Sequence, residues 1–503
     1  MNGKRFYKPV LLLLALALLW SSSSMQRQLN ADRNTLGLTR EIDRTGMPPV
    51  LAVTTVALGG FRGLIANVLW IRAGELQLQD KYFEMVQLAD WITKLQPHVT
   101  TVWYHQAWNM TYNISVKFPN PKDRWFWVRR GMELLRDEGL RYNPEETLLY
   151  RELAWFFQDK MGKNLDDAHL YFKLNWAYEM HVLFGEKKPD FAELKDPKTD
   201  ETRARTKTLR EVYKLDPDLM EQVDKEYGPF DWRLPEAHAV YWAVKGLKFS
   251  RKEEQTQLRR VVYQSMQLAF ERGRMIENKV EHTMDFGPNL DIIPNANKAY
   301  EKMIADESAL QKDGGDKFKQ GHHYFLKNVV MNLYTHNREK DAERWFATLK
   351  DKYPETMIGL PQTLDNFAVY YVMQEVKDGS VTKIKGIIEG YLYQWCYNLA
   401  IDEEDKAVSM ERLARKIWLR HETNVEVVKD KNRVNLPPYE DIKKEVIQRM
   451  LDPQRGLRPN MAAILRTKFN MPAPTNAPPE LSPFISKPTP ATTNSGPVVA
   501  PKK

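Results

Sequence analysis

The stretch DAERWFATLKDKYP, residues 341–354, decides the fold. It places small, aromatic, aliphatic and proline residues at steps of four, three and five: Ala342, Phe346, Leu349 and Pro354. Apolar residues at steps of three and four fall on one face of a helix, and a proline shortly after them marks its end. The stretch therefore predicts an amphipathic helix that buries one face, either as one helix among many or as half of a repeating unit.

The segment before it, residues 323–340, supplies a first helix for such a unit. Its apolar residues again recur at steps of three and four: Leu326, Val329, Val330 and Leu333. With the stretch above, this segment resembles the 34-residue tetratricopeptide (TPR) pattern, W-x2-L-G-x2-Y followed by A-x3-F and a closing proline. The resemblance implies a helical hairpin that pairs residues 323–335 with 340–352.

Closing prolines locate further copies of the unit. Six residues after Pro97 and Pro144 an aromatic residue, Trp103 and Tyr150, opens a new first helix. The step from Leu69 to Trp103 is 34 residues (103 − 69), which is the repeat length. The aligned first-helix positions are Leu69, Ala73 and Leu76, then Trp103, Ala107 and Met110, then Tyr150, Ala154 and Phe157.

The third copy follows after 47 residues (150 − 103), and a loop at 114–126 accounts for the excess. A weaker copy at 239–249 keeps Trp242, Gly246 and Phe249 in the same spacing. Any amphipathic helical hairpin satisfies much of this pattern by burial alone, so a helical array of another kind is the alternative. The register is also open by one residue, because 70–74 fits the pattern as well.

The expected fold class is all-α: a solenoid of TPR-like antiparallel helix hairpins. Apolar residues recur at helical spacing from 62 to 470, and alternating β-branched runs are few. The predicted segments are a signal peptide or membrane anchor (1–24), a linker with an apolar lead-in (25–61), TPR-like repeats (62–182), a charged, solvated insertion (183–234), further TPR-like repeats (235–355), a C-terminal helical region (356–470) and a disordered Pro-rich tail (471–503).

The first 24 residues have the layout of a secretory signal. Lys4, Arg5 and Lys8 precede an apolar run, Val10–Trp20, and small polar serines follow. The run is shorter than the roughly 20 residues that cross a bilayer, and a clean cleavage site is missing, so both a cleaved signal and a retained anchor stay open. The sequence thus predicts a membrane-anchored or secreted protein whose body lies on the extracytoplasmic side.

Several classes of chemistry lack sequence support. A single cysteine, Cys396, excludes an internal disulfide and a cysteine-based zinc site. The motifs of serine hydrolases, phosphate-binding loops, zinc proteases and c-type haem are absent, and the neighbouring His322 and His323 point about 100° apart on a helix. The net charge of +8 comes from 74 basic against 66 acidic residues, a near balance. We therefore expect no catalytic residue, metal, cofactor or nucleic acid.

Tryptophan is concentrated in the first repeats, where eight of the fourteen lie between residues 70 and 176. The TPR resemblance implies that repeat positions two, five, nine and twelve face a concave groove. Trp103 is expected in the core instead. The resulting partner-binding residues are Trp70, Tyr104, Trp108, Arg151, Trp155 and Gln158, with Tyr324, Lys327, Met331 and Tyr334 in the later copy.

These features predict a non-enzymatic, exported and membrane-tethered scaffold. Its aromatic groove suits an extended peptide or a sugar chain, because flat rings pack on prolines, aliphatic stems or pyranose faces. The expected partner is another protein or an envelope polymer, and the oligomeric state is left open. A glycan-acting enzyme of the envelope and a purely structural spacer are the alternatives; the enzyme needs two carboxylates held ~5 to 9.5 Å apart beside the aromatics.

Overall fold

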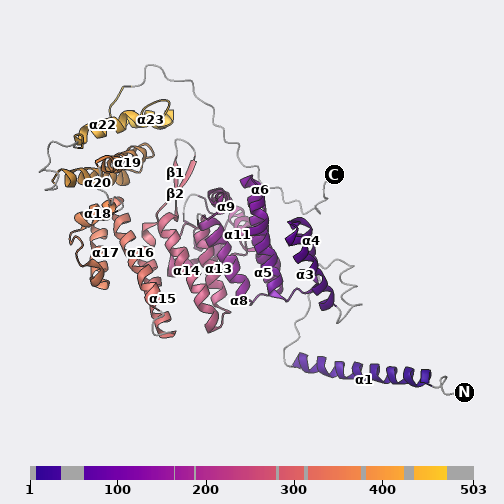
Figure 1. Cartoon of the computed structure of the whole chain (residues 1–503). Coiled ribbons are helices and arrows are strands. Elements are labelled where there is room, and N and C mark those ends of the chain that lie inside the picture. The colour runs from indigo at the N-terminus through magenta and orange to yellow at the C-terminus, as the bar shows by residue number, and fades with distance from the viewer. Residues whose placement is uncertain are drawn as a thin grey trace. The chain divides into compact units, whose positions relative to one another are not determined.

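The computed structural model describes residues 7–35, 62–163, 165–185, 188–278, 283–310, 315–374, 381–423 and 436–472. These residues are mostly helical, and their only strands, β1 (Arg274–Asn278) and β2 (Thr283–Gly287), form one two-stranded sheet (Figure 1). The all-α prediction is confirmed. The chain divides into two compact units, Met1–Glu277 with Met284–Val329, and Asn278–Thr283 with Val330–Lys503.

The first unit covers the N-terminal segment for which repeats were predicted. Its α-helices are α1 (Tyr7–Thr35), α3 (Arg62–Leu78), α4 (Tyr82–Leu95), α5 (Thr100–Trp108), α6 (Pro121–Glu133), α7 (Leu140–Tyr142), α8 (Thr147–Trp155), α9 (His169–Phe184), α10 (Phe191–Lys195), α11 (Asp200–Glu211), α12 (Pro217–Tyr227), α13 (Pro235–Leu247), α14 (Lys252–Arg272), α15 (Ile293–Leu310) and most of α16 (Asp316–Thr335). Three π-helical turns extend α5, α6 and α8: η3 (Asn109–Ile114), η5 (Leu134–Gly139) and η6 (Phe156–Gly162). The 3-10 turns are η4 (Ser115–Lys117) and η7 (Leu290–Ile292).

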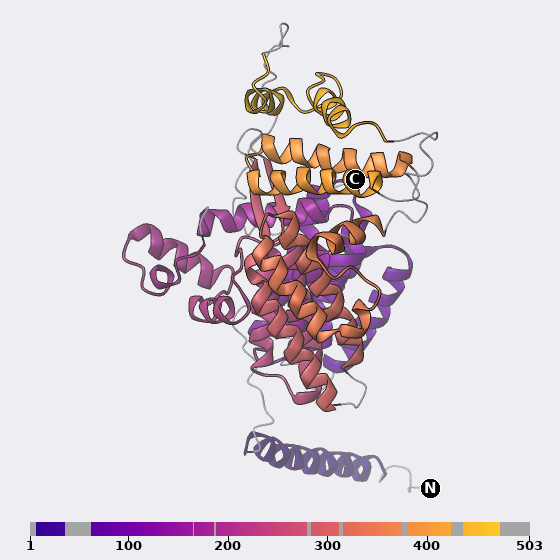
Figure 2. The ribbon, with the colours of Figure 1, turned by 90° about the vertical axis from the view of Figure 1, so that its left-hand side faces the viewer.

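The second unit begins within α16 and holds the stretch that opened the analysis. Its further helices are α17 (Glu339–Lys352), the 3-10 turn η8 (Pro354–Met357), α18 (Leu364–Met373), α19 (Val381–Ala400), α20 (Glu404–Glu422), α22 (Tyr439–Met450) and α23 (Pro459–Lys468). The long orange helices α19 and α20 pack side by side (Figure 2). In α17, Ala342, Phe346 and Leu349 are buried, as their spacing predicts.

The predicted membrane location is wrong. The apolar run Val10–Trp20 forms part of one helix, α1, that continues through the serines into charged residues. Eleven helical residues span only about 16 Å, about half of the roughly 30 Å hydrocarbon core. Among the described residues no helix is both long and apolar enough to cross a membrane. This finding overturns the prediction of an anchored or secreted protein with an extracytoplasmic body.

The residues aligned at the first-helix positions form the core of the first unit. All of them except Leu69 are buried, and Leu69 packs against a buried cluster. The aromatic residues that follow the closing prolines also reach back to them. The indole N–H of Trp103 donates to the carbonyl of Pro97 at 2.8 Å, and the hydroxyl of Tyr150 donates to the carbonyl of Pro144 at 2.7 Å. These two hydrogen bonds fix how each hairpin follows the one before it.

The weaker copy brings α13 close to α8. A Cβ placed on Gly246 would lie 2.7 Å from the Cβ of Tyr150, which is closer than carbon atoms approach without displacement. Neither Cβ can rotate away, since both are fixed to their helices. Gly246 is therefore required by the close approach of α13 and α8.

Gly246→Ala should destabilise the first unit by about 1–3 kcal/mol, because overpacking a tight helix contact forces the backbones apart. Gly74→Ala is the matched control, since its Cβ would meet nothing within 4 Å on α3. That variant should stabilise the same unit by roughly 0.5–1 kcal/mol through helix propensity. Urea unfolding measures both. Equal effects of the two substitutions would contradict the close packing of α13 on α8.

The charged segment 183–234 contains the short helices that were expected, but it is not simply solvated. Most of its larger apolar residues lie in the core, among them Phe191, Leu194, Leu209, Leu215, Leu219, Met220, Val223, Phe230, Trp232 and Leu234. The carboxylate of Asp224 accepts from the indole N–H of Trp232 at 3.0 Å and from the backbone N–H of Phe230 at 2.9 Å. Charged residues dominate the composition because α11 and α12 bury only one face each.

Next to this segment, His238 on α13 is enclosed by aromatic rings. Its ring stacks on Phe157 at 5.4 Å and meets Trp176 edge to face at 4.9 Å. The Nε2 atom lies 2.9 Å from the carbonyl oxygen of Trp232, so Nε2 carries the proton and donates it. Burial lowers the pKa of His238 from 6.5 to about 4, since a charged imidazolium loses its hydration there.

This lowered pKa predicts acid sensitivity. The unfolded chain binds a proton at His238 below pH 6.5 but the folded chain only below about pH 4, so stability is complete above pH 6.5 and falls between these values. The free energy of unfolding should drop by roughly 3 kcal/mol from this group alone. His238→Gln keeps an N–H donor and does not titrate. Unfolding in urea at several pH values should show the extra drop in the wild type only; equal slopes would contradict it.

Two further expectations concern the helical content of 62–470 and the C-terminal tail. The expectation that 62–470 is almost wholly helical is confirmed for the described residues, and the short strands β1 (RMIEN) and β2 (TMDFG) are the exception. β-branched and aromatic residues there are too few for a sequence signal. The predicted tail, 471–503, lies outside the described residues except for Met471 and Pro472.

Candidate functional site

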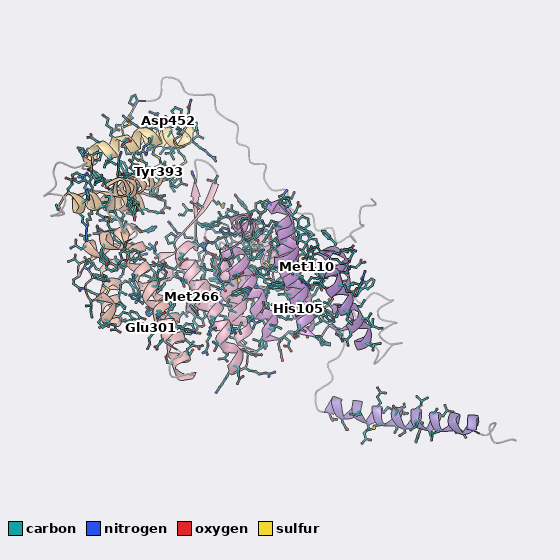
Figure 3. All side chains as sticks on the ribbon, viewed as in Figure 1. His105, Met110, Met266, Glu301, Tyr393 and Asp452 are labelled. Atoms are coloured by element: carbon teal, nitrogen blue, oxygen red, sulfur yellow. The ribbon has the colours of Figure 1, made fainter. Side chains whose placement is uncertain are left out.

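The predicted groove residues of the first repeats lie on α3, on α5 with η3, and on α8 with η6. Trp70, Tyr104, Trp108, Arg151 and Trp155 are all half-buried, so each presents part of its side chain to solvent. Trp103, next to Tyr104, is only 1% exposed and belongs to the core, as predicted. Figure 3 labels His105 and Met110 on this part of the chain. We call these five residues, Trp70, Tyr104, Trp108, Arg151 and Trp155, the aromatic row.

Gln158 is not part of this surface, contrary to the prediction. Its side chain is fully buried, and its amide donates to the carbonyl of Val261 on α14 at 3.2 Å. The cause is the π-helical turn η6, which closes hydrogen bonds from residue i to i+5 and inserts extra residues per turn. The next residue, Asp159, is also buried, and its carboxylate lies beside Tyr112.

The π turns bring Tyr112 and Asp159 together beside the row. The ring of Tyr112 stacks on Trp108 at 5.6 Å, and its hydroxyl donates to the carboxylate of Asp159 at 3.0 Å. Burial raises the pKa of Tyr112 well above its usual range, and the nearby carboxylate raises it further. The phenol is thus held protonated, and it links η3 to η6.

Lys163 ends the row with a positive charge. Its ammonium donates to the other oxygen of Asp159 at 3.1 Å and lies 4.6 Å from the centre of the Trp155 ring. The side chain is 30% exposed. One residue of this end thus offers an exposed cation above an aromatic face, which favours contact with a polar backbone or an anionic group.

At the other end, Trp70 on α3 meets α5. The Trp70 ring contacts His105 edge to face at 6.0 Å, and His105 lies 5.2 Å from the ring of Tyr104. Burial raises the pKa of Tyr104, and the carboxylate of Glu152 on α8 adds to this effect. Arg151 forms an ion pair with Glu152 while its own side chain stays 37% exposed. Ring contacts therefore join α3 to α5, and the electrostatic interaction of Tyr104 with Glu152 joins α5 to α8.

A buried ionic network supports the row from behind. Lys160 is 4% exposed, and its ammonium pairs with Asp166 at 2.6 Å while lying 4.9 Å from the centre of the Tyr112 ring. Burial lowers the pKa of Lys160, and the Asp166 carboxylate opposes that shift. Asp166 also pairs with Arg124 of α6 at 2.9 Å. These contacts hold Tyr112 in place, because the Lys160 ammonium beside its ring is itself fixed by the ion pairs of Asp166.

The residues predicted from the later copy do not join this row. Tyr324 is exposed and Lys327 half-buried on the part of α16 that lies in the first unit. Tyr334 belongs to the second unit and is fully buried, which contradicts its predicted place on a groove. Its hydroxyl donates to Asp365 at 2.8 Å and accepts from Lys416 at 3.0 Å. Met331 is also buried, so it does not line a groove either.

Sequence reasoning missed three members of the site: Tyr112, Asp159 and Lys163. A signal for them exists, because residues 104, 108 and 112 and residues 151, 155, 159 and 163 recur at steps of four. Steps of four lie on one helix face. The fixed repeat positions of the TPR pattern led to Gln158 instead.

The site shows the features of a binding surface. No group of three or more His, Cys, Asp or Glu side chains within the described ranges is placed to hold a metal ion. Both carboxylates beside the row have partners, Glu152 with Arg151 and Asp159 with Tyr112 and Lys163.

Compared with known proteins, the chain matches no family model, no curated protein and no solved structure.

Proposed function

We propose that the protein is a non-enzymatic adapter built on TPR-like helical repeats, and that its aromatic row binds an extended segment of another protein. The observation that carries the proposal is the placement of half-buried rings on three helices, with Trp70 on α3, Tyr104 and Trp108 four residues apart on α5, and Trp155 on α8. Trp70, Tyr104, Trp108 and Trp155 all keep part of their surface in water. Exposed aromatic surface of this extent marks an interaction site.

The repeat interpretation is supported by two features of the first unit. Leu69 and Trp103 are one 34-residue step apart in the sequence, and both pack toward the interior, Leu69 against a buried cluster and Trp103 at 1% exposure. Trp103 and Tyr150 each donate to the carbonyl of the proline six residues earlier. A sequence spacing and a hydrogen bond that recur together favour repeating hairpins over unrelated helices.

An extended peptide fits the chemistry of the row. Aromatic faces pack on prolines and aliphatic stems, and the exposed parts of Arg151 and Lys163 can donate to backbone carbonyls or to acidic side chains. Arg151 lies on α8 and Lys163 directly follows η6, so the two cations are separated as anchors along a chain would be. The carboxylates are held in ion pairs, which supports binding rather than general acid–base catalysis.

Trp108→Ala and Trp155→Ala test the proposal. Peptides are selected from a random 15-residue display library on the full chain, and the dissociation constant of an enriched peptide is measured by calorimetry. Each substitution should weaken binding by about 1–3 kcal/mol, roughly 5- to 150-fold, because it removes an aromatic contact from the interface. The fold should stay intact, since both side chains are only half-buried.

Trp91→Ala is the matched control. Trp91 is 44% exposed on α4, the second helix of the first hairpin, and lies outside the row. Its loss should leave the dissociation constant unchanged. If selection yields no enriched peptide, or if Trp91→Ala weakens binding as much as Trp108→Ala, the row is not a peptide-binding surface and a structural spacer becomes the better interpretation.

A further inference from the structure

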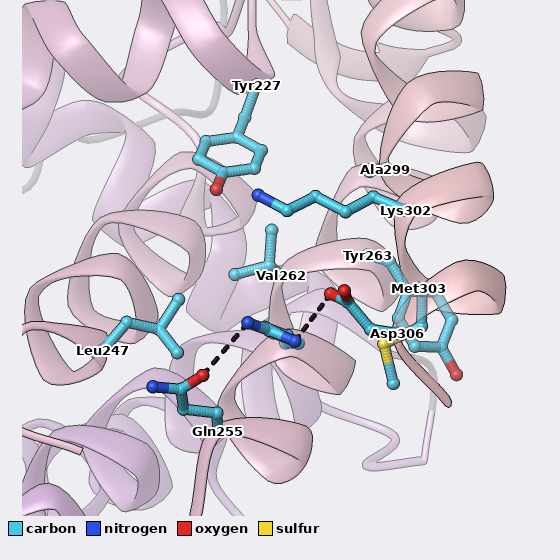
Figure 4. Close-up of a pocket in the computed structure, with 10 residues that line it drawn as sticks. Tyr227, Leu247, Gln255, Val262, Tyr263, Ala299, Lys302, Met303 and Asp306 are labelled. Carbon is cyan, nitrogen blue, oxygen red and sulfur yellow. Dashed lines mark hydrogen bonds and ion pairs between the residues drawn. The ribbon is translucent and has the colours of Figure 1, made fainter. Parts of the chain in front are cut away.

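A second candidate site lies elsewhere in the first unit. Helices α12, α13, α14 and α15 enclose a pocket of about 180 Å³ (Figure 4). Leu247, Val262 and Met303 give it an apolar wall, and the last two are almost fully buried. None of its lining residues belongs to the aromatic row. The pocket is smaller than the 300–1,000 Å³ typical for drug-sized ligands, so it suits a small molecule.

The charged side chains that line the pocket are Arg259, Lys302 and Asp306, two positive and one negative. The guanidinium of Arg259 pairs with the carboxylate of Asp306 at 2.6 Å and donates to the side-chain oxygen of Gln255 at 3.0 Å. That pair neutralises itself. Lys302 forms no ion pair or hydrogen bond with the described residues, and its ammonium points toward the hydroxyl of Tyr227 (Figure 4). One uncompensated positive charge therefore faces the pocket.

Tyr227 lies beside that charge, and its hydroxyl faces a carboxylate. Burial raises the pKa of Tyr227 above its usual range, and a hydrogen bond to Glu226 raises it further. The phenol thus keeps its proton at neutral pH and directs it to Glu226. The Lys302 ammonium, above an apolar wall, is left to match an anion that carries a hydrocarbon chain.

We propose that this pocket binds a small monocarboxylic acid with a short apolar chain. The carboxylate accepts hydrogen bonds from the Lys302 ammonium. The chain contacts Val262, Leu247 and Met303. Asp306 does not repel the ligand strongly, because Arg259 holds its charge in an ion pair. The inference is independent of the peptide-binding function proposed for the aromatic row.

The test uses hexanoate and the full-length chain, with binding followed by calorimetry and by ligand-observed NMR. Hexanoate should bind saturably, and Lys302→Met should weaken binding about 10-fold or more, since a charge-assisted hydrogen bond is lost. Lys298→Met, one turn earlier on α15 and outside the pocket lining, is the matched control and should change nothing.

Two further measurements separate the proposal from simple charge attraction. Ala299→Phe fills the pocket and should abolish hexanoate binding while circular dichroism stays unchanged. Hexylamine, which has the same chain and the opposite charge, should not compete. The proposal is overturned if hexanoate shows no saturable binding at about 10 mM, if hexylamine competes equally, or if Lys302→Met and Lys298→Met have the same effect.

Discussion

Replacing Trp103 by alanine should lower the free energy of unfolding of the first unit by about 3–5 kcal/mol. The side chain is 1% exposed and stacks on Tyr142 at 5.7 Å, so its removal leaves a large cavity between α5 and α7. The substitution also removes the donor to the Pro97 carbonyl, although the amide of Asn143 still donates to that oxygen at 2.8 Å. Cavity formation therefore accounts for most of the loss.

Urea unfolding followed by tryptophan fluorescence measures the effect. Eleven of the fourteen tryptophans lie in the first unit, so the signal reports mainly on its transition. Trp103→Phe keeps much of the apolar volume and should cost less than the alanine variant. Trp91→Ala, at an exposed position, should change stability by less than about 1 kcal/mol. A small loss for Trp103→Ala would mean that this tryptophan does not hold the repeats together.

Removing the charge of Lys173 should have an effect of similar size. Lys173 on α9 is 1% exposed, and its ammonium contacts Glu236 on α13 at 2.5 Å and the carbonyl of Arg272 at 2.9 Å. It also lies 4.6 Å from the ring centre of Phe286. Lys173→Met leaves Glu236 buried without its counter-charge. Breaking such a pair from one side costs about 3–5 kcal/mol.

The double variant Lys173→Met, Glu236→Met provides the control. It removes both buried charges and replaces them by apolar side chains of similar size, which is often neutral for stability. We expect its free energy of unfolding to lie within about 1 to 2 kcal/mol of the wild type. If the double variant is as unstable as Lys173→Met, the loss comes from packing and not from the unpaired carboxylate.

The sequence predicts the parts of the fold that depend on apolar spacing. Ala342, Phe346 and Leu349 are buried on one face of α17, and Trp103 lies in the core, because burial imposes a period that is visible in one chain. The closing prolines are also informative. Pro97 and Pro144 each lie three residues before a helix, α5 or α8, and the aromatic residue six positions later donates to the carbonyl of its proline.

Other features depend on local helix geometry or on contacts between distant residues, and these leave no periodic pattern in the sequence. The π-helical turn η6 moves Gln158 into the core and Asp159 toward Tyr112, a shift that no fixed repeat pattern contains. The pairing of Lys173 with Glu236 joins residues 63 positions apart. The apolar run Val10–Trp20 matches a signal by composition, but its length and the helix around it do not fit a membrane span.

Site-specific crosslinking tests the central claim, that the aromatic row is a peptide-binding surface, most directly. A photoreactive phenylalanine analogue replaces Tyr104 or Trp155 on the row, or Trp91 on α4 as the control, and the full chain is irradiated with a peptide enriched by display selection. We predict covalent adducts at Tyr104 and Trp155 that excess unlabelled peptide suppresses, and none at Trp91. Adducts at Trp91 with none at the two row positions would show that the peptide binds elsewhere and would contradict the claim.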